Sequence, residues 1–128
     1  MKILLIDDSK IMRNIQKNVL KGFGECECME AGDGVEGLSV LAANTSPFDL
    51  ILVDWNMPNM DGLSFVKRMR EKDKSTPVIM VTTEAEKTRI IDAIKAGVNN
   101  YVIKPFTPDS LMERIRQTLD KVKTGAAA

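Results

Sequence analysis

Several carboxylates in this sequence stand directly after apolar runs, where catalytic or metal-binding groups are often found. Asp54 follows the apolar run 50–53, and the pair Asp7-Asp8 follows the apolar run 3–6. Carboxylates that gather in one place repel one another, and a hard divalent cation such as Mg²⁺ relieves that repulsion with oxygen ligands. A carboxylate beside such a cation is suited to accept a phosphoryl group covalently.

Two further polar side chains follow other predicted strands. Thr82 follows the run 78–81, and Lys104 follows the run 100–103. A hydroxyl group and an ammonium group both suit phosphoryl oxygens. Each residue alone also has a plainer interpretation, with Thr82 and the Asp pair as helix caps and Lys104 as a solvated loop lysine. Because all of them stand at the ends of predicted strands, a shared site is the favoured interpretation.

The elements that must position these residues are predicted to be parallel strands. Short apolar runs without alternation are typical of strands that are covered on both faces. With the segment 26–31, which mixes polar and apolar residues as an edge strand would, five predicted strands alternate with five helices, and this predicts a doubly wound α/β fold. The first, third and fourth runs are the most uniformly apolar and should be central. This ranking predicts a five-stranded parallel sheet of order 2-1-3-4-5, the flavodoxin-like arrangement, whose ligands bind beyond the carboxyl ends of the strands.

The helices are predicted from apolar residues at helical spacing. The expected inward positions, in chain order, are Ile11, Ile15 and Val19, then Val35, Leu38, Leu41 and Ala42, then Val66 and Met69, then Ile90, Ile91 and Ile94, and finally Leu111, Ile115, Leu119 and Val122. Ser9 is predicted to cap the first helix, and Pro108 to begin the last one.

The composition indicates one domain and argues against two classes of partner. The chain has 128 residues, of which 44% are hydrophobic, and its 18 basic residues balance its 18 acidic ones. A net charge of zero argues against nucleic-acid binding, which needs a basic excess. No apolar run reaches the length of a membrane span, and no signal peptide precedes the first strand, so we expect a cytosolic protein. We expect residues 1–123 to form the domain and residues 124–128 to be a frayed tail.

Cysteine and histidine usage narrows the chemistry further. Cys26 and Cys28 would point to the same face of a strand, which does not suit a mutual disulfide. Without other soft ligands nearby, a metal site at these cysteines is not expected either. The chain has no histidine, so any phosphohistidine must come from a partner.

The polar residues at the strand ends, together with an aromatic residue at Tyr101 and with Pro105 after Lys104, resemble the motif set of response-regulator receiver domains. The resemblance covers about residues 2–122, and the segments 54–63 and 104–107 are especially similar to chemotaxis members of that family. It implies that Asp54 is the phosphoacceptor, supplied by the phosphohistidine of a histidine kinase. It also implies a switch that catalyses its own phosphorylation and dephosphorylation, rather than an enzyme acting on other substrates.

The same resemblance assigns roles to the remaining site residues. Asp8, Asp54 and the backbone carbonyl of Asn56 would bind Mg²⁺ directly, and Asp7 would act mainly through water. Lys104 and Thr82 would hold the phosphoryl oxygens. A further pair, Asn56 and Glu84, would tune the hydrolysis of the acyl phosphate. Thr83 departs from the family, which usually has Ala or Gly there, and its bulk bears on the reaction rates.

The resemblance also predicts how the signal leaves the site. Thr82 would move toward the phosphoryl group, and Tyr101 would turn inward into the vacated space, although an ordinary partly buried edge tyrosine is the plainer interpretation. A partner-binding face is predicted at Lys87, Ile90, Ile94, Tyr101 and Arg114. Its cations and apolar area would suit an acidic amphipathic peptide, although a solvated helix face is the alternative for the two cations.

The implied partners are a histidine kinase of the chemotaxis type, a protein target such as a flagellar motor switch component, and a phosphatase, for a chain that acts as a monomer. Three alternatives stay open at this point. The chain could be a receiver domain cut from a longer regulator. It could instead be a Mg²⁺-dependent phosphatase with an Asp nucleophile. By resemblance, however, such enzymes carry the nucleophile after the first strand, with a second Asp two residues on. A flavodoxin-like FMN carrier would want a phosphate-binding loop there, in place of two carboxylates.

Overall fold

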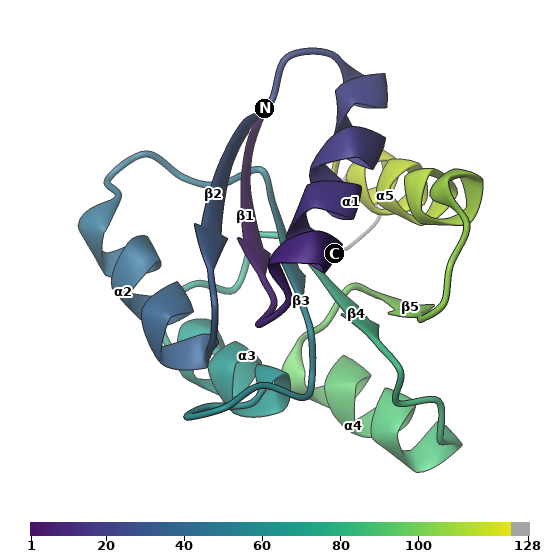
Figure 1. Ribbon diagram of the computed structural model, residues 1–128. Helices are drawn as coiled ribbons and strands as arrows, with labels where there is room; N and C mark the ends of the chain where they lie inside the picture. Colours follow the sequence, from purple (N-terminus) through teal and green to yellow (C-terminus); the bar gives the residue numbers. More distant parts are fainter. Residues whose placement is uncertain (124–128) are drawn as a thin grey trace.

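The computed structural model describes residues 1–123, so the predicted tail 124–128 lies outside the described residues (Figure 1). The strands are β1 (Lys2–Ile6), β2 (Glu27–Ala31), β3 (Leu50–Val53), β4 (Val78–Thr82) and β5 (Asn100–Ile103). All paired strands are parallel, and they form one sheet of order β2-β1-β3-β4-β5. The predicted strand order is therefore confirmed.

Helices cover both faces of this sheet. They are α1 (Lys10–Leu20), α2 (Gly34–Ala43), α3 (Gly62–Arg70), α4 (Lys87–Ala96) and α5 (Pro108–Lys123), with a short 3₁₀ helix η1 (Lys21–Phe23) after α1. Figure 1 shows α1 and α5 on one face and α2, α3 and α4 on the other. No helix within residues 1–123 is long and apolar enough to cross a membrane.

The central strands are buried on both faces, as their unbroken apolar runs predict. In β1, Leu4 and Ile6 pack in the core beneath α2, α3 and α4. The alternate residues Ile3 and Leu5 pack in the core beneath α1 and α5. Full burial of such a side chain contributes about 1.5–3 kcal/mol to stability, so these strands form a firm base for the polar residues that follow them.

The register brings the carboxyl ends of the strands to one edge of the sheet. Ile6 pairs with Val53, and Thr82 pairs with Ile103. Gly62 then allows the chain to return close to this edge, since its N–H donates to the Trp55 carbonyl at 2.8 Å. A Cβ at position 62 would collide with the carbonyl oxygen of the residue after β3, so a glycine is required there.

Two of the three α1 residues that were predicted to face inward do not do so. Ile11 and Ile15 are 75% and 39% exposed, whereas Val19 is buried as predicted and Leu20 is buried beside it. Gln16, a polar residue that the apolar pattern excluded, is also buried on this face.

Ion pairs lie on the side of α1 opposite the two exposed isoleucines. The side chains of Arg13 and Lys17 each pair with a carboxylate oxygen of Glu30 in β2 at 2.9 Å. Their hydrogen bonds lower the pKa of Glu30 below its usual value, the Lys17 contact most strongly. These contacts join one side of α1 to β2, while Ile11 and Ile15 on the other side face solvent.

The same error recurs in other helices, where residues predicted to face inward are exposed. They are Val35, Ala42, Ile91, Ile94 and Val122. In α2 and α4 the buried residues are small ones instead. A Cβ at Gly37 would lie 2.7 Å from the Ile6 side chain, and Ala93 is fully buried. The predicted inward positions of α3, together with Leu111 and Ile115 of α5, are confirmed.

Candidate functional site

The carboxylates that follow β1 and β3 come together at the carboxyl edge of the sheet. One oxygen atom each of Asp7, Asp8 and Asp54 lies within 4.8 Å of the other two. Asp7 and Asp54 are 1% and 8% exposed, whereas Asp8 faces solvent. Within residues 1–123, no other group of three or more such ligands is close enough to hold a metal ion. The structure thus brings the three predicted carboxylates together.

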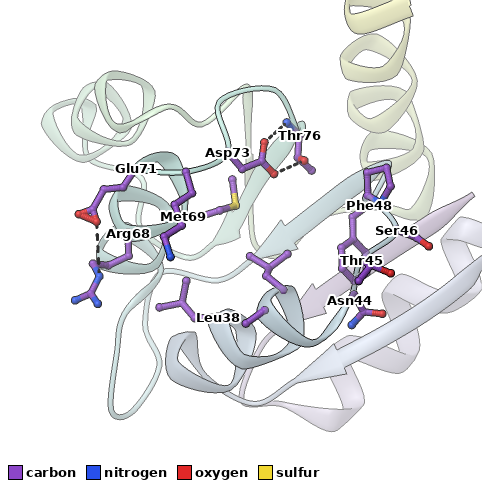
Figure 2. Close-up of a pocket in the computed structure, with 14 residues that line it drawn as sticks. Leu38, Asn44, Thr45, Ser46, Phe48, Arg68, Met69, Glu71, Asp73 and Thr76 are labelled. Carbon is purple, nitrogen blue, oxygen red and sulfur yellow. Dashed lines mark hydrogen bonds and ion pairs between the residues drawn. The ribbon is translucent and has the colours of Figure 1, made fainter.

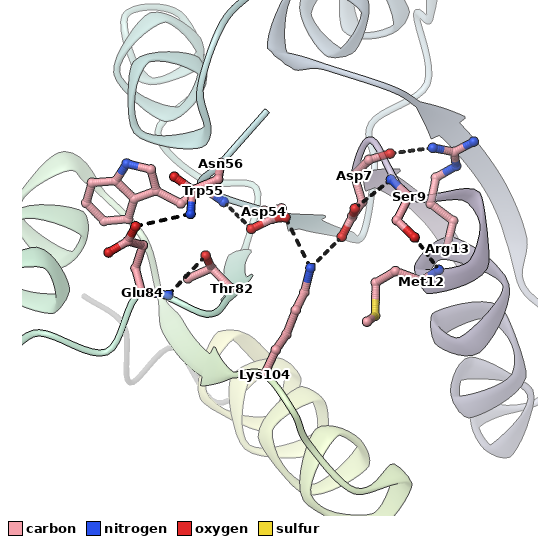
Figure 3. A network of polar contacts seen from close by, with 10 residues as sticks. All are labelled: Asp7, Ser9, Met12, Arg13, Asp54, Trp55, Asn56, Thr82, Glu84 and Lys104. Carbon is pink, nitrogen blue, oxygen red and sulfur yellow. Dashed lines mark hydrogen bonds and ion pairs between the residues drawn. The ribbon is translucent and has the colours of Figure 1, made fainter. Parts of the chain in front are cut away.

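Backbone amides fix the two buried carboxylates (Figure 3). Asp7 Oδ1 accepts a hydrogen bond from the N–H of Ser9 at 2.9 Å, and Asp54 Oδ1 accepts one from the N–H of Trp55 at 2.7 Å. Ser9 is also the predicted cap of α1, since its hydroxyl accepts from the backbone amide of the first helical turn. The start of α1 therefore orients Asp7, and the turn after β3 orients Asp54.

Lys104 bridges the two buried carboxylates, as Figure 3 shows. Its Nζ lies 2.9 Å from Asp7 Oδ2 and 3.1 Å from Asp54 Oδ2. Burial by itself lowers the pKa of a lysine, but the hydrogen bonds and charges of Asp7 and Asp54 outweigh it and raise the pKa of Lys104 above its usual value. Lys104 is therefore a firmly protonated cation at the centre of the site.

The donor set fits a hard divalent cation. All three acidic side chains offer oxygen, which is what Mg²⁺ prefers, and no thiol or imidazole joins them among the described residues. Three carboxylates and one ammonium also leave two negative charges in excess. The site is able to hold a metal ion, and a divalent one would neutralise it.

A second group of predicted residues lies on the β4 side of Asp54. Thr82 is fully buried, and its hydroxyl oxygen accepts a hydrogen bond from the N–H of Glu84 at 3.3 Å. The Glu84 carboxylate accepts a hydrogen bond from the Asn56 side-chain amide at 3.1 Å. This bond joins the loop after β3 to the loop after β4. Thr83, which lies between Thr82 and Glu84 in the sequence, is exposed.

Tyr101 is turned into the protein and contacts the same loop. Its hydroxyl donates a hydrogen bond to the Glu84 carbonyl at 2.7 Å, and the side chain is buried. Burial, followed by the charge of Glu84, raises the pKa of Tyr101 to about 12. One residue, Glu84, therefore contacts Asn56, Thr82 and Tyr101 through its carboxylate, its amide and its carbonyl respectively.

We expect this tyrosine, the only one in the chain, to resist ionisation in the folded protein. It should titrate near pH 12, against about 10 in the urea-unfolded chain. Stability should then fall as the pH rises between these two values, because only the unfolded chain releases the proton there. Tyrosinate absorption followed against pH measures both midpoints. A folded midpoint near 10 would contradict the buried, hydrogen-bonded geometry.

The predicted partner-binding face is only partly accessible in this conformation. Lys87, Ile94 and Arg114 are exposed, whereas Ile90 is half-buried against the core and Tyr101 is buried. The exposed part of this face therefore combines two cations with one isoleucine.

Sequence reasoning missed two contacts beside the carboxylates. The Arg89 guanidinium lies over the Trp55 ring, 5.2 Å from its centroid. Asn59, in the loop after β3, donates a hydrogen bond from its side-chain amide to Asp33 at 2.7 Å. Both Asn59 and Asp33 stand in segments rich in turn-forming residues, which indicate turns but not that the two turns meet.

A separate cavity of about 500 Å³ lies between α2 and α3 at the opposite edge of the sheet (Figure 2). Its apolar wall includes Leu38, Phe48 and Met69. The Asp73 carboxylate at its rim accepts hydrogen bonds from the amide and hydroxyl of Thr76 at 3.0 and 2.5 Å. None of the predicted site residues lines this cavity, so it is not part of the acidic site.

Comparison with known proteins agrees with this geometry. A family model described as "Response regulator receiver domain" matches residues 3–116. Among curated relatives, the chemotaxis protein CheY homolog of Campylobacter jejuni is 47% identical over 121 residues, with 93% of this chain and 92% of the relative covered. Chemotaxis protein CheY of Pseudomonas aeruginosa is 44% identical over 124 residues, with 95% and 98% covered.

Solved structures show the same similarity over nearly the whole chain. A CheY-like receiver domain protein from Methanospirillum hungatei superposes with a TM-score of 0.86 at 28% identity, covering 97% of both chains. The chemotaxis response regulator CheY4 of Vibrio cholerae superposes with a TM-score of 0.82 at 34% identity, covering 91% of this chain and 97% of the other. These matches agree with the strand order and helix placement described above.

Proposed function

The chain belongs to the response regulator receiver family, and we propose that it is a phosphorylation-dependent switch of a chemotaxis-type two-component system, with Asp54 as the phosphoacceptor. The observation that carries this proposal is the convergence of Asp7, Asp8 and Asp54 around one point, with Lys104 bridging two of them. Such a site combines a nucleophilic carboxylate with positive charge for phosphoryl oxygens, which is what acyl-phosphate formation requires.

Mg²⁺ is the proposed cofactor of this site. Asp8, Asp54 and the backbone carbonyl of Asn56 would hold it directly, and Asp7 would hold it mainly through water. When bound, the ion neutralises the charge of the phosphoryl oxygens during transfer. The oxygen-only donor set and the excess of two negative charges support this choice.

In the proposed reaction, an oxygen of the Asp54 carboxylate attacks the phosphorus of a partner's phosphohistidine. The new P–O bond forms as the P–N bond breaks, and the imidazole leaves with the bonding electron pair. Lys104 would release its hold on Asp54 and donate to a phosphoryl oxygen, because its protonated amine already lies 3.1 Å from the Asp54 oxygen. The Thr82 hydroxyl would donate a hydrogen bond to another phosphoryl oxygen.

The switch would also remove its own phosphoryl group. A water molecule attacks the phosphorus of the acyl phosphate, and the P–O bond to Asp54 breaks to release inorganic phosphate. Asn56 and Glu84 stand beside the mouth of the site and are hydrogen-bonded to each other, so they would control how readily water approaches. The bulk of Thr83 next to Glu84 would modulate both rates.

The proposed output is a shift in packing that reaches the partner-binding face. Thr82 would exchange its hydrogen bond with Glu84 for one with the phosphoryl group. Tyr101, which the resemblance predicts to turn inward into the vacated space, already lies inward in this structure and would be held there. Lys87, Ile90, Ile94 and Arg114 would then bind an acidic amphipathic segment of the target.

The partners that we propose are a chemotaxis-type histidine kinase, a target such as a flagellar motor switch component, and a phosphatase, all met in the cytoplasm by a monomeric protein.

Labelling by a small phosphodonor tests the proposed chemistry. Incubation with acetyl phosphate and Mg²⁺ should add one phosphoryl group that hydroxylamine removes, since an acyl phosphate is cleaved by that nucleophile and a phosphoserine ester is not. Chelation of Mg²⁺ should prevent the labelling. A label that resists hydroxylamine, or that forms equally well without a divalent cation, would contradict the proposal.

Two of the three functions that the sequence left open fit the site less well. A Mg²⁺-dependent phosphatase would place its nucleophile after β1 with a second Asp two residues on, whereas Asp7 and Asp8 are adjacent. An FMN carrier would place the phosphate of its ligand beside the same two carboxylates, which repel it. A receiver domain cut from a longer regulator would share the chemistry proposed here.

A further inference from the structure

The loop that follows Asp54 contains a strained turn. The N–H of Met60 donates a hydrogen bond to the Pro58 carbonyl at 2.7 Å, which closes a three-residue γ-turn around Asn59. Asn59 has φ 66°, and it is the only residue other than glycine with positive φ within residues 1–123. A γ-turn with positive φ is rare, and such a conformation persists where surrounding contacts hold it.

The contacts that hold this turn come from the loop between β2 and α2. The Asn59 amide donates to Asp33 Oδ2 at 2.7 Å, while Asp33 Oδ1 caps α2 by accepting from the N–H of Glu36 at 2.8 Å. The next residue, Gly34, donates its own N–H to the Met60 carbonyl at 3.2 Å. A Cβ at Gly34 would lie 2.9 Å from that carbonyl oxygen, so the two loops touch through their backbones.

The other end of the loop is fixed at the sheet. Gly62 N–H donates to the Trp55 carbonyl at 2.8 Å, and Asp61 caps α3 by accepting from the N–H of Ser64 at 2.8 Å. The chain between Trp55 and the γ-turn carries Asn56, whose side chain reaches Glu84. The position of Asn56 therefore depends on a base anchored at β3 and on a tip anchored at Asp33.

We propose that Asp33 and Asn59 are positioning residues, whose hydrogen bond holds the loop 55–61 so that Asn56 presents its carbonyl to the metal and its amide to Glu84. Neither residue touches the reacting atoms. This inference rests on the proposed function, because it concerns how the same site is shaped for a divalent cation. The bond links two loops that are 26 residues apart, so it also ties α2 to the site.

The charge state of Asp33 agrees with this role. The hydrogen bond from the Glu36 amide, and then the one from Asn59, lower the pKa of Asp33 below its usual value. Asp33 is thus a carboxylate at neutral pH, and a charged acceptor strengthens the bond that it receives from Asn59.

Two single variants separate this bond from the other roles of the two residues. Asp33→Ser keeps a hydroxyl that caps α2 but is too short to reach Asn59. Asn59→Gly adopts positive φ without strain and lacks the side chain. Asp61→Ser is the matched control, since it also exchanges a capping carboxylate near the site for a capping hydroxyl, without breaking the bond between the loops.

The experiment measures the Mg²⁺ dissociation constant from the fluorescence of Trp55, the only tryptophan, and the hydrogen exchange of the amides in the segment 55–61 without metal. Both single variants should raise the dissociation constant about five-fold and speed the exchange, and the double variant should be no weaker than the worse single one. Asp61→Ser should bind within about two-fold of the unmodified protein. Urea unfolding checks that each variant is folded.

The outcomes separate this inference from the proposed function. If the unmodified protein binds Mg²⁺ and both single variants bind it equally well, the positioning role is wrong while the proposed function stands. If the unmodified protein does not bind Mg²⁺, the proposed metal site fails, and the exchange measurement decides the inference alone. Unchanged exchange in Asp33→Ser and Asn59→Gly would then overturn it.

Discussion

Exchange of Asp54 for Asn is expected to abolish labelling by acetyl phosphate in the presence of Mg²⁺. The amide that replaces the carboxylate is a poor nucleophile and carries no charge for a cation, so both the bond-forming atom and a metal ligand are lost. The fold should persist, because an Asn oxygen still accepts the hydrogen bond from the Trp55 amide. Phosphoprotein yield, measured by mass spectrometry under conditions that preserve acyl phosphates, reports the result.

A matched variant controls for the loss of one negative charge as such. Asp49→Asn removes a carboxylate next to the other end of β3, where Asp49 accepts a hydrogen bond from the Lys2 amide at 2.7 Å. That variant should be labelled as fast as the unmodified protein. If Asp54→Asn were labelled to a similar extent, another residue would be the acceptor and the assignment of Asp54 would fall.

Exchange of Lys104 for Met should lower stability without metal and slow labelling, but it should strengthen Mg²⁺ binding. The Met side chain keeps the apolar stem but leaves Asp7 and Asp54 facing each other without their shared cation, which should cost about 3 kcal/mol of stability in the absence of metal. Labelling should slow on the order of 10²-fold, because a donor to the phosphoryl oxygens is removed. Mg²⁺ should bind more tightly than in the unmodified protein, since the ammonium no longer competes for two carboxylates.

Urea unfolding with and without Mg²⁺ measures this prediction together with the labelling rate. The ion should recover much of the stability lost by the variant, because it binds only the folded site. Lys74→Met, at an exposed position, is the control and should behave as the unmodified protein. Equal stability of Lys104→Met and the control without metal would show that the bridging geometry contributes nothing.

The strands and the strand-end residues could be predicted because their cause is local. The runs 3–6, 50–53 and 78–81 are apolar at every position, which is the pattern of a strand covered on both faces, and each ends abruptly on a polar residue. In a parallel sheet such ends share one edge, so the convergence of Asp7, Asp8 and Asp54 followed from the topology.

The helix faces and the contacts around the site could not be predicted in the same way. The buried face of α1 includes the polar residue Gln16, and the buried residues of α2 are Gly34 and Gly37. The bonds from Tyr101 to Glu84 and from Asn59 to Asp33 join residues 17 and 26 positions apart. Hydrophobic spacing carries no information on such pairs, since they depend on how loops meet in space.

We propose above all that the carboxylates of Asp7, Asp8 and Asp54 share one divalent cation, which prepares Asp54 for phosphoryl transfer. A crystal structure obtained with Mn²⁺, located by its anomalous scattering, tests this claim most directly. The predicted result is a single ion coordinated by Asp8, Asp54 and the backbone carbonyl of Asn56, with Asp7 reached through water. An ion bound without Asp54, or no ion at these carboxylates at saturating Mn²⁺, would contradict the claim.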